Sequence, residues 1–397
     1  MTPTEPTLRA RSLPTPGAKR ATVIGAGSFG TALAVLLARG GLRTTLQART
    51  AEQAARLEGE HENHVYLPGV ELPSQLRIEP TSAGVARADY VFLAVPSSGL
   101  GEVIAMLDEA GLDRRAAVVS VAKGLVSPEG LPPTTVLSAR FGAHRVACLG
   151  GPAHAQEMVH EGAGLVAASS DEELTRALAQ VFTRAGVVCE QSNDPLGVEL
   201  AGAAKNAAAL AAGATEAQGL NAAGAAAGHI FAEVWRYAEG LGARPESMIG
   251  LAGAGDLVAT ALARDSRNRR AGELLAAGVP AAEIPARIGQ AVEALESVPL
   301  LARALERAGV GTDERAGVGT DEPAGEPSGD VTSGGTGERP GGRAPITTAL
   351  GRLISGELPL DEWVALVRAT VPPPARWRRP QPGFWRRAWR WATGKAR

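Results

Sequence analysis

Short apolar runs and longer amphipathic stretches alternate along the first half of the chain. The apolar runs have the length and β-branched content of buried strands, and they cover residues 21–24, 44–46, 90–95, 117–121 and 146–149. A helical pattern of apolar positions fills residues 31–39. Strands that are separated by helical segments predict a doubly wound parallel sheet, which binds its ligands beyond the carboxyl ends of its strands.

The strand pattern fades after residue 194. Alanine-rich helical sequence continues to about residue 308 and returns from residue 346 to about residue 369. We therefore predict an α/β fold in two domains, with the sheet in residues 19–194 and an all-helical C-terminal domain in residues 195–370. Two domains also fit the length of 397 residues, because a single hydrophobic core stops growing near ~250 to 300 residues.

Three segments fall outside this pattern. Residues 1–18 are rich in Pro, Thr and Arg and predict a disordered tail. Residues 308–344 contain the run AGVGTDE twice, among Gly, Pro and acidic residues, and predict a flexible low-complexity insertion. Residues 371–397 form a basic tail that carries four Trp and eight Arg or Lys from residue 375 onward. Such a tail suits peripheral contact with an anionic membrane, with a solvated or self-docking tail as the alternative.

Composition narrows the class of function. The net charge of −2 argues against a general polyanion binder, so we expect no nucleic-acid partner. The cysteines, Cys148 and Cys189, are too few for a disulfide framework, and both lie in apolar stretches that indicate buried strands. The sequence has no run of about 18 uncharged apolar residues, the length a membrane span needs. A protein of the reducing cytoplasm fits these features best.

The first predicted strand leads directly into a glycine-rich turn. Residues 25–30 read GAGSFG and open the first helix, so Gly25, Gly27 and Gly30 match the G-x-G-x-x-G spacing in the context where it binds a dinucleotide. Glycines let the backbone approach the pyrophosphate, which then meets the positive end of the helix dipole. We therefore expect the N-terminal domain to be Rossmann-like and to bind a dinucleotide, with a purely structural turn as the alternative.

Arg49 follows the second predicted strand, where an NAD site would place an acidic residue that binds the ribose. A guanidinium at this position can pair with a 2′-phosphate. The sequence therefore favours NADP(H) as the cofactor. NAD(H) stays the alternative, because the pattern is equally compatible with Arg49 as a solvated surface residue.

Lys205 stands in a long run of Ala and Gly. An ammonium group among small apolar residues is costly to bury without a partner. The pattern therefore predicts a ligand or an acidic partner for Lys205. A lysine that reaches solvent from an alanine-rich helix gives the same pattern, so the run is not sufficient evidence by itself.

Other polar residues occur where a ligand site is expected. Lys123 follows a predicted strand and is placed to meet an anionic substrate. Asp256 stands in a glycine-flanked turn and can accept from a substrate hydroxyl or from Lys205. Arg267 and Asn268 carry multi-donor groups suited to phosphate oxygens. Each alone is compatible with a surface loop or a helix cap, and it is their combination that indicates a site.

These motifs together resemble the NAD(P)-dependent sn-glycerol-3-phosphate dehydrogenase family of the soluble bacterial type. The likeness runs from about residue 20 to residue 369 in the family's order. Its most specific pieces are ELAGAAKN at residues 199–206 and SRNR at residues 266–269. The other matching pieces are GAGSFG at 25–30, NHVYLP at 63–68, VPS at 95–97, KGL at 123–125, GP at 151–152 with Glu157, GDL at 255–257 and GQAVE at 289–293.

The resemblance implies an oxidoreductase that interconverts dihydroxyacetone phosphate and sn-glycerol 3-phosphate, which supplies glycerol phosphate for phospholipid synthesis. It implies that Lys205 is the general acid/base that protonates the developing alkoxide. It implies substrate contacts, with Arg267 on the phosphate, for Lys123, Gly151, Ala153, Lys205, Asp256, Ser266, Arg267 and Asn268. It implies cofactor contacts for Gly25, Gly27, Ser28, Phe29, Gly30, Arg49, Lys123, Ala155, Arg267 and Glu293.

Two other functions stay open at this stage. A β-hydroxyacid dehydrogenase with another substrate would share the architecture and a lysine on a helix. A catalytically idle cofactor-binding regulator would share the fold, although it need not keep Lys205, Asp256 and Arg267. We expect no metal site, and the oligomeric state is left open, with a homodimer as one option.

Overall fold

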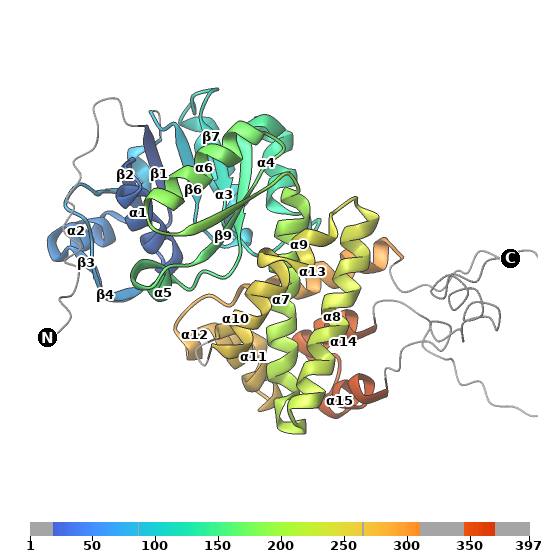
Figure 1. Ribbon diagram of the computed structural model, residues 1–397. Helices are drawn as coiled ribbons and strands as arrows, with labels where there is room; N and C mark the ends of the chain where they lie inside the picture. The colour runs from blue at the N-terminus through green and yellow to red at the C-terminus, as the bar shows by residue number, and fades with distance from the viewer. Residues whose placement is uncertain (1–18, 86, 264–265, 310–344, 370–397) are drawn as a thin grey trace, which may run out of the picture.

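A central sheet organises the first part of the chain (Figure 1). The computed structural model describes residues 19–85, 87–263, 266–309 and 345–369. Within these residues the sheet has eight strands in the order β10-β9-β8-β7-β6-β1-β2-β5. The strands are β1 (Arg20–Ile24), β2 (Arg43–Ala48), β5 (Arg77–Pro80), β6 (Tyr90–Leu93), β7 (Ala117–Ser120), β8 (Val146–Gly150), β9 (Gly164–Ala168) and β10 (Val188–Ser192). A small antiparallel sheet pairs β3 (Glu62–Asn63) with β4 (Leu67–Glu71).

Helices cover both faces of the central sheet. Successive residues of a strand point to opposite faces, and the alternating residues Phe92 and Leu93 of β6 accordingly enter two different buried apolar clusters. The helices of this part are α1 (Ser28–Arg39), α2 (Ala51–Glu60), α3 (Leu100–Glu109), α4 (Pro133–Phe141), α5 (Ala155–His160) and α6 (Glu172–Arg184). The cluster with Phe92 packs against α1 and α6, and the cluster with Leu93 packs against α3 and α4.

The predicted α/β class is confirmed, but the sheet is not wholly parallel. β9 runs antiparallel to β8 and parallel to β10, while the other neighbours in the sheet are parallel. The apolar pattern did not predict β5 and β9, and it indicated β10 only through the stretch around Cys189. β5 and β10 lie at the two edges of the sheet, where one side of each strand lacks a neighbour and the residues need not be apolar.

The prediction that Cys189 lies in a buried strand is wrong. Cys189 lies in the edge strand β10, whose residues are partly buried or exposed, and its own side chain is only partly buried. Cys148 in β8 is buried, as predicted. The difference follows from position, because β8 lies inside the sheet and β10 has a single strand neighbour.

The second part of the chain is helical. We call the described residues up to 194 the sheet region and those from 195 the helical region. Asp194 caps the first helix by accepting from the Gly197 amide at 2.9 Å, and Pro195 occupies its first position. The helices are α7 (Pro195–Thr215), α8 (Leu220–Gly240), α9 (Pro245–Ile249), α10 (Asp256–Leu262), α11 (Arg267–Ala276), α12 (Ile284–Ile288), α13 (Glu293–Arg307), α14 (Pro345–Ser355) and α15 (Leu360–Ala369).

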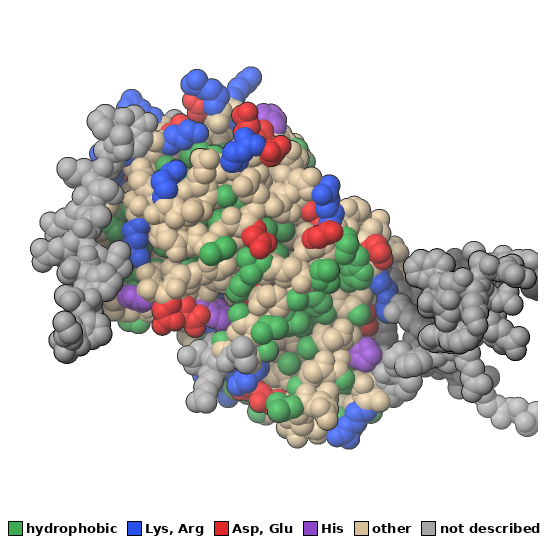
Figure 2. All heavy atoms as spheres, in the orientation of Figure 1, with side chains coloured by type: hydrophobic (Ala, Val, Ile, Leu, Met, Phe, Trp, Pro, Cys, Tyr) green, Lys and Arg blue, Asp and Glu red, His purple; other side chains and the backbone are tan. Residues whose placement is uncertain are grey.

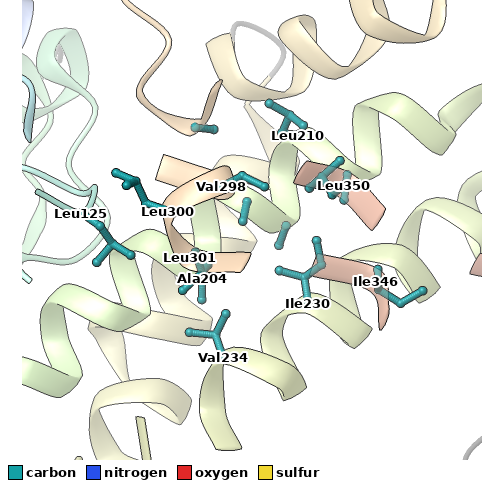
Figure 3. Packing of buried hydrophobic residues seen from close by; sticks show 14 of the residues in the cluster. Leu125, Ala204, Leu210, Ile230, Val234, Val298, Leu300, Leu301, Ile346 and Leu350 are labelled. Atoms are coloured by element: carbon teal, nitrogen blue, oxygen red, sulfur yellow. The ribbon is translucent and has the colours of Figure 1, made fainter. Parts of the chain in front are cut away.

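The long helix α7 forms the centre of the helical region, and nearly all of its residues are buried. Two glycines let α11 lie against it backbone to backbone. A Cβ at Gly213 would lie 2.0 Å from the Arg269 carbonyl oxygen, and a Cβ at Gly272 would lie 2.0 Å from the Leu210 carbonyl oxygen. Figure 3 shows part of the apolar cluster that unites α7 with α8, α13 and α14. The alanine-rich sequence is therefore a close-packed core helix.

Charged and apolar side chains are unevenly spread over the face drawn in Figure 2. Charged side chains gather at the upper end of the sheet region, while hydrophobic ones spread over the helical region where α7, α8 and α9 lie.

No helix among the described residues is long and apolar enough to cross a membrane. The predicted tails 1–18 and 371–397 and nearly all of the predicted insertion 308–344 lie outside the described residues.

Candidate active site

The glycine-rich turn between β1 and α1 is crowded by neighbouring backbone at Gly25 and Gly30 and faces open space at Gly27. Gly25 has a φ of +111°, and a Cβ there would lie 2.4 Å from the Ala94 carbonyl oxygen. A Cβ at Gly30 would lie 1.9 Å from the Gly25 carbonyl oxygen, whereas the Cβ position of Gly27 faces open space. Gly27 is the N-cap of α1 and leaves its first amides free of a side-chain cap. This turn fits a dinucleotide pyrophosphate.

Asn63 holds the turn through its side chain, although no motif in the sequence assigned a role to it by itself. Its side-chain amide is buried and donates to the Ala26 carbonyl oxygen at 3.1 Å and to the Thr31 hydroxyl at 2.8 Å. Asn63 is 37 residues from Ala26. A local pattern cannot reveal such a partner, so only the resemblance of residues 63–68 pointed to this segment.

Three charged side chains meet where the helical region faces the carboxyl ends of β7 and β8. Asp256 Oδ2 accepts from Lys123 Nζ at 2.6 Å, and Asp256 Oδ1 lies 3.5 Å from Lys205 Nζ. Lys123 Nζ also donates to the Gly151 carbonyl oxygen at 3.0 Å. The side chain of Asp256 is 1% exposed and that of Lys205 is 8% exposed, so both are shielded from water. We call Lys123, Asp256 and Lys205 the lysine–aspartate cluster.

Asp256 owes its place in this cluster to an irregular backbone. Residues Leu251–Gly255 form a π-helical turn directly before α10, and Asp256 is the first residue of α10. The N-cap position of α10 belongs to Gly255. Asp256 is therefore not a helix cap, the structural alternative left open by the sequence, and its carboxylate is directed to the two lysines.

Burial and mutual charge shift the pKa values in this cluster. The pKa of Lys205 falls from 10.5 to about 8, because burial and the ammonium of Lys123 disfavour its charged form more than the Asp256 carboxylate favours it. Burial raises the pKa of Asp256, but the ammonium groups of Lys123 and Lys205 outweigh burial and the net shift is downward. Asp256 is thus held as a carboxylate, and Lys205 titrates close to neutral pH.

A chain of side-chain amides connects the SRNR segment to the cluster. Asn268 Nδ2 donates to Asn206 Oδ1 at 2.9 Å, and Asn206 Nδ2 donates to the Lys123 carbonyl oxygen at 3.2 Å. Asn206 is buried and follows Lys205 directly on α7. The sequence motifs assigned no separate role to Asn206. The signal was available, because a buried amide among alanines needs a partner for the same reason as a buried ammonium.

Glu293 joins two strand-end loops to the helical region. Its carboxylate accepts from the Ser97 amide at 3.3 Å and from the Lys123 amide at 3.2 Å. Burial raises its pKa, and these two hydrogen bonds oppose the shift. Ser97 follows β6 and Lys123 follows β7, so Glu293 fixes both loops beside the cluster.

The remaining predicted residues contact neither Asp256 nor the two lysines. Arg267 is exposed and donates to Gln290 Oε1 at 3.0 Å, and Ser266 is the N-cap of α11. Arg49 lies beyond β2, apart from the cluster; its side chain is exposed and makes no hydrogen bond or ion pair with another described residue. The carboxyl edge of the sheet carries the other predicted contacts, at strand ends and helix starts: Ser28, Phe29, Ala153 and Ala155.

Among the described residues, no group of three or more His, Cys, Asp or Glu is placed to hold a metal ion.

A glycine-rich turn on a doubly wound sheet and a buried lysine–aspartate cluster at its carboxyl edge define a nicotinamide-dinucleotide-dependent dehydrogenase. Residues 20–175 match the family model of the NAD-dependent glycerol-3-phosphate dehydrogenase N-terminus, and residues 194–314 match the model of its C-terminus. The chain belongs to the NAD-dependent glycerol-3-phosphate dehydrogenase family.

Curated and solved relatives agree with this membership. A Deinococcus radiodurans protein named glycerol-3-phosphate dehydrogenase, NAD(P)+, is 42% identical over 286 residues, which are 70% of this chain and 83% of the relative. A Chlorobium phaeobacteroides protein of the same name is 37% identical over 303 residues, which are 73% of this chain and 88% of the relative. The crystal structure of glycerol-3-phosphate dehydrogenase from Coxiella burnetii aligns with a TM-score of 0.75 at 26% identity and covers 89% of this chain and 100% of that chain.

Proposed function

We propose that this chain interconverts dihydroxyacetone phosphate and sn-glycerol 3-phosphate with NADP(H) or NAD(H), and that Lys205 transfers the proton. The main support for the proposal is the position of Lys205. Its Nζ is buried 3.5 Å from Oδ1 of the ionised Asp256, and the pKa of Lys205 is about 8. A general acid is most effective when its pKa lies near the working pH. We further propose that the glycerol phosphate formed supplies phospholipid synthesis.

A bound nicotinamide cofactor would supply the hydride that the carbonyl carbon of the ketone receives. In the same step the Lys205 ammonium donates its proton to the carbonyl oxygen, so the C=O bond becomes a secondary alcohol and Lys205 becomes a neutral amine. Lys205 then recovers a proton from solvent, and in the oxidative direction the amine accepts the hydroxyl proton. Asp256 accepts from Lys123 at 2.6 Å and thereby keeps a second cation at the site, where it attracts the phosphorylated substrate.

The phosphate of the substrate is assigned to Arg267 and Asn268. Both lie in the first turn of α11, where backbone amides and the helix dipole favour an anion. The Asn268 amide is already oriented by Asn206, and the exposed Arg267 guanidinium has donors left beyond its bond to Gln290. This arrangement supports recognition of a phosphorylated three-carbon substrate next to Lys205.

The pH dependence of the two directions is expected to be opposite. Reduction of the ketone needs the ammonium form of Lys205, so kcat should fall as pH rises through the Lys205 pKa of about 8. Oxidation needs the amine form, so kcat should rise over the same range. Initial rates in both directions from pH 6 to about 10 test this. Parallel pH profiles in the two directions would remove Lys205 from the proton-transfer step.

The cofactor preference is proposed to favour NADP(H) through Arg49, whose exposed guanidinium stands after β2 and has no side-chain partner among the described residues. Arg49→Glu is expected to weaken NADPH relative to NADH by about 10- to 100-fold, the range of one lost charged hydrogen bond. Competitive binding of both cofactors measures the ratio. Arg56→Glu, which changes an exposed arginine on α2, is the matched control. An unchanged ratio in the Arg49 variant would show that another residue sets the preference.

The proposed reaction is tested in the oxidative direction. The purified chain is mixed with NADP+ or NAD+ and sn-glycerol 3-phosphate, and formation of the reduced cofactor is followed by absorbance. The mirror-image isomer of sn-glycerol 3-phosphate and unphosphorylated glycerol are the control substrates. Reduction of the cofactor with sn-glycerol 3-phosphate alone supports the proposal, and equal rates with glycerol would show that no phosphate is recognised.

A further inference from the structure

Glu199 is a buried acidic residue that the proposed mechanism does not use, and burial raises the pKa of its carboxyl group to about 8 against the hydrogen bonds from Thr134. It lies on α7, six residues before Lys205, and is 4% exposed. Both carboxylate oxygens accept from the Thr134 amide at 3.0 Å, and Oε2 also accepts from the Thr134 hydroxyl at 2.6 Å. Thr134 is in the first turn of α4, so these bonds join the helical region to the sheet region.

The same face of α7 reaches the segment that carries Lys123. Residues three and seven positions apart lie on one face of an α-helix, which places Glu199, Gly202 and Asn206 together. A Cβ at Gly202 would lie 3.4 Å from the Lys123 Cβ, and Asn206 donates to the Lys123 carbonyl oxygen at 3.2 Å. One helix face therefore contacts residues 123–134 at both ends, through Asn206 and Gly202 at the start and through Glu199 at the end.

The middle of this segment is also attached to the helical region. Leu125 is 1% exposed and belongs to the apolar cluster formed mainly by helices of that region. Figure 3 shows Leu125 pointing from the sheet side toward the helices that carry Ala204, Leu300 and Leu301. The segment is thus fixed by packing and by polar contacts, and the amide and hydroxyl of its last residue, Thr134, both donate to one side chain, Glu199.

We propose that Glu199 is a positioning residue that holds the start of α4 against α7 and thereby sets where Lys123 stands relative to Asp256 and Lys205. The inference rests on the proposed function, because the lysine–aspartate cluster performs the proton transfer there. Lys123 is bonded to Asp256 at 2.6 Å, and Lys205 lies at 3.5 Å from the same carboxylate. A shift of residues 123–134 would move Lys123 relative to both Asp256 and Lys205, whereas the Asp256–Lys205 distance lies within the helical region.

The chain contains a matched control in Glu233 on α8. Glu233 is 3% exposed, and its carboxylate accepts from the Ile346 and Thr347 amides at 3.1 and 2.9 Å and from the Thr347 hydroxyl at 2.6 Å. The chemistry repeats that of Glu199 with Thr134, but both partners lie within the helical region, apart from the segment with Lys123. Both glutamates accept from a threonine hydroxyl and from backbone amides, and they connect different parts of the chain.

The test compares Thr134→Val with Thr347→Val, which each remove one hydroxyl bond to a buried glutamate. Both variants are expected to lower the melting temperature. Only Thr134→Val is expected to lower kcat, by about tenfold, since displaced catalytic groups lose rate steeply. Thr134→Ser keeps the hydroxyl and should restore kcat. Glu199→Gln and Glu233→Gln repeat the comparison with the carboxylates themselves.

A second readout separates positioning from simple loss of stability. Lys123, Asp256 and Glu293 are the charged groups that act on Lys205. If Lys123 moves away from the cluster, Lys205 loses a repulsive neighbour, and the pH at which reduction falls to half should rise in Thr134→Val. It should stay unchanged in Thr347→Val.

The outcomes are distinguishable from failure of the proposed function. A wild-type chain that reduces no ketone overturns the function and this inference with it. An active wild type with equal kcat and pH midpoint in Thr134→Val and Thr347→Val, at similar losses of melting temperature, overturns the inference and leaves the function standing.

Discussion

Lys205→Ala is expected to lower kcat for dihydroxyacetone phosphate reduction by about 10²- to 10⁴-fold, the range that a general acid contributes. The reason is that Lys205 is a buried ammonium at 3.5 Å from Asp256 with a pKa of about 8, so it can release a proton where water is excluded. Cofactor affinity should stay close to that of the wild type, because the glycine-rich turn lies on β1 and α1 and not on α7. Single-turnover kinetics and NADPH titration measure the two quantities.

Two control variants sharpen this result. Lys205→Arg keeps a positive charge but cannot release a proton near neutral pH, so its kcat should fall about as far as that of the alanine variant. Lys19→Ala removes a lysine whose ammonium donates to the Tyr90 hydroxyl at 3.0 Å in the sheet region, and its kcat should match the wild type. An active Lys205→Arg variant would show that Lys205 contributes charge alone.

Asp256→Asn is expected to lower kcat by about 10²-fold, because it removes the negative charge between two ammonium groups. Asp256 is 1% exposed and contacts Lys123 at 2.6 Å and Lys205 at 3.5 Å. Without the carboxylate, Glu293 is the remaining charge that opposes burial and the Lys123 ammonium at Lys205, so the pKa of Lys205 should fall further below 10.5. The pH above which reduction declines should therefore move to a lower value, which a pH–rate profile measures.

The control for this change is Asp89→Asn. Asp89 is an exposed carboxylate that accepts from the Arg20 amide at 2.7 Å, away from the lysine–aspartate cluster. Its replacement should leave both kcat and the pH profile unchanged. A profile in Asp256→Asn that shifts upward, or does not shift, would contradict the role given to the Asp256 charge.

The features that sequence could reveal are those with a local physical cause. The turn at residues 25–30 could be predicted because crowding by nearby backbone requires glycine at two positions. A Cβ at Gly30 would clash with the Gly25 carbonyl oxygen of the same turn, and a Cβ at Gly25 would clash with the Ala94 carbonyl oxygen just after β6. Lys205 was visible because a charge among alanines is costly to bury. The same reasoning applied to Asn206 would have predicted a buried amide with a partner.

The features that sequence could not reveal depend on partners far apart in the chain. Glu199 and Thr134 are 65 residues apart, and Lys123 and Asp256 are 133 apart. No periodicity records such a pairing, and the π-helical turn that aims Asp256 at the lysines has no local pattern of its own. The antiparallel direction of β9 could not be predicted either, because it depends on the connection through α5 and not on the residues of the strand.

The most direct test of the account is the loss of NADPH absorbance, and in parallel of NADH absorbance, when dihydroxyacetone phosphate is added to the purified full-length chain. Unphosphorylated dihydroxyacetone and a β-keto acid are the controls. Rapid oxidation with dihydroxyacetone phosphate alone, faster with NADPH than with NADH, is the expected result. Oxidation driven by the β-keto acid instead, or cofactor binding without any oxidation, would contradict the proposed function.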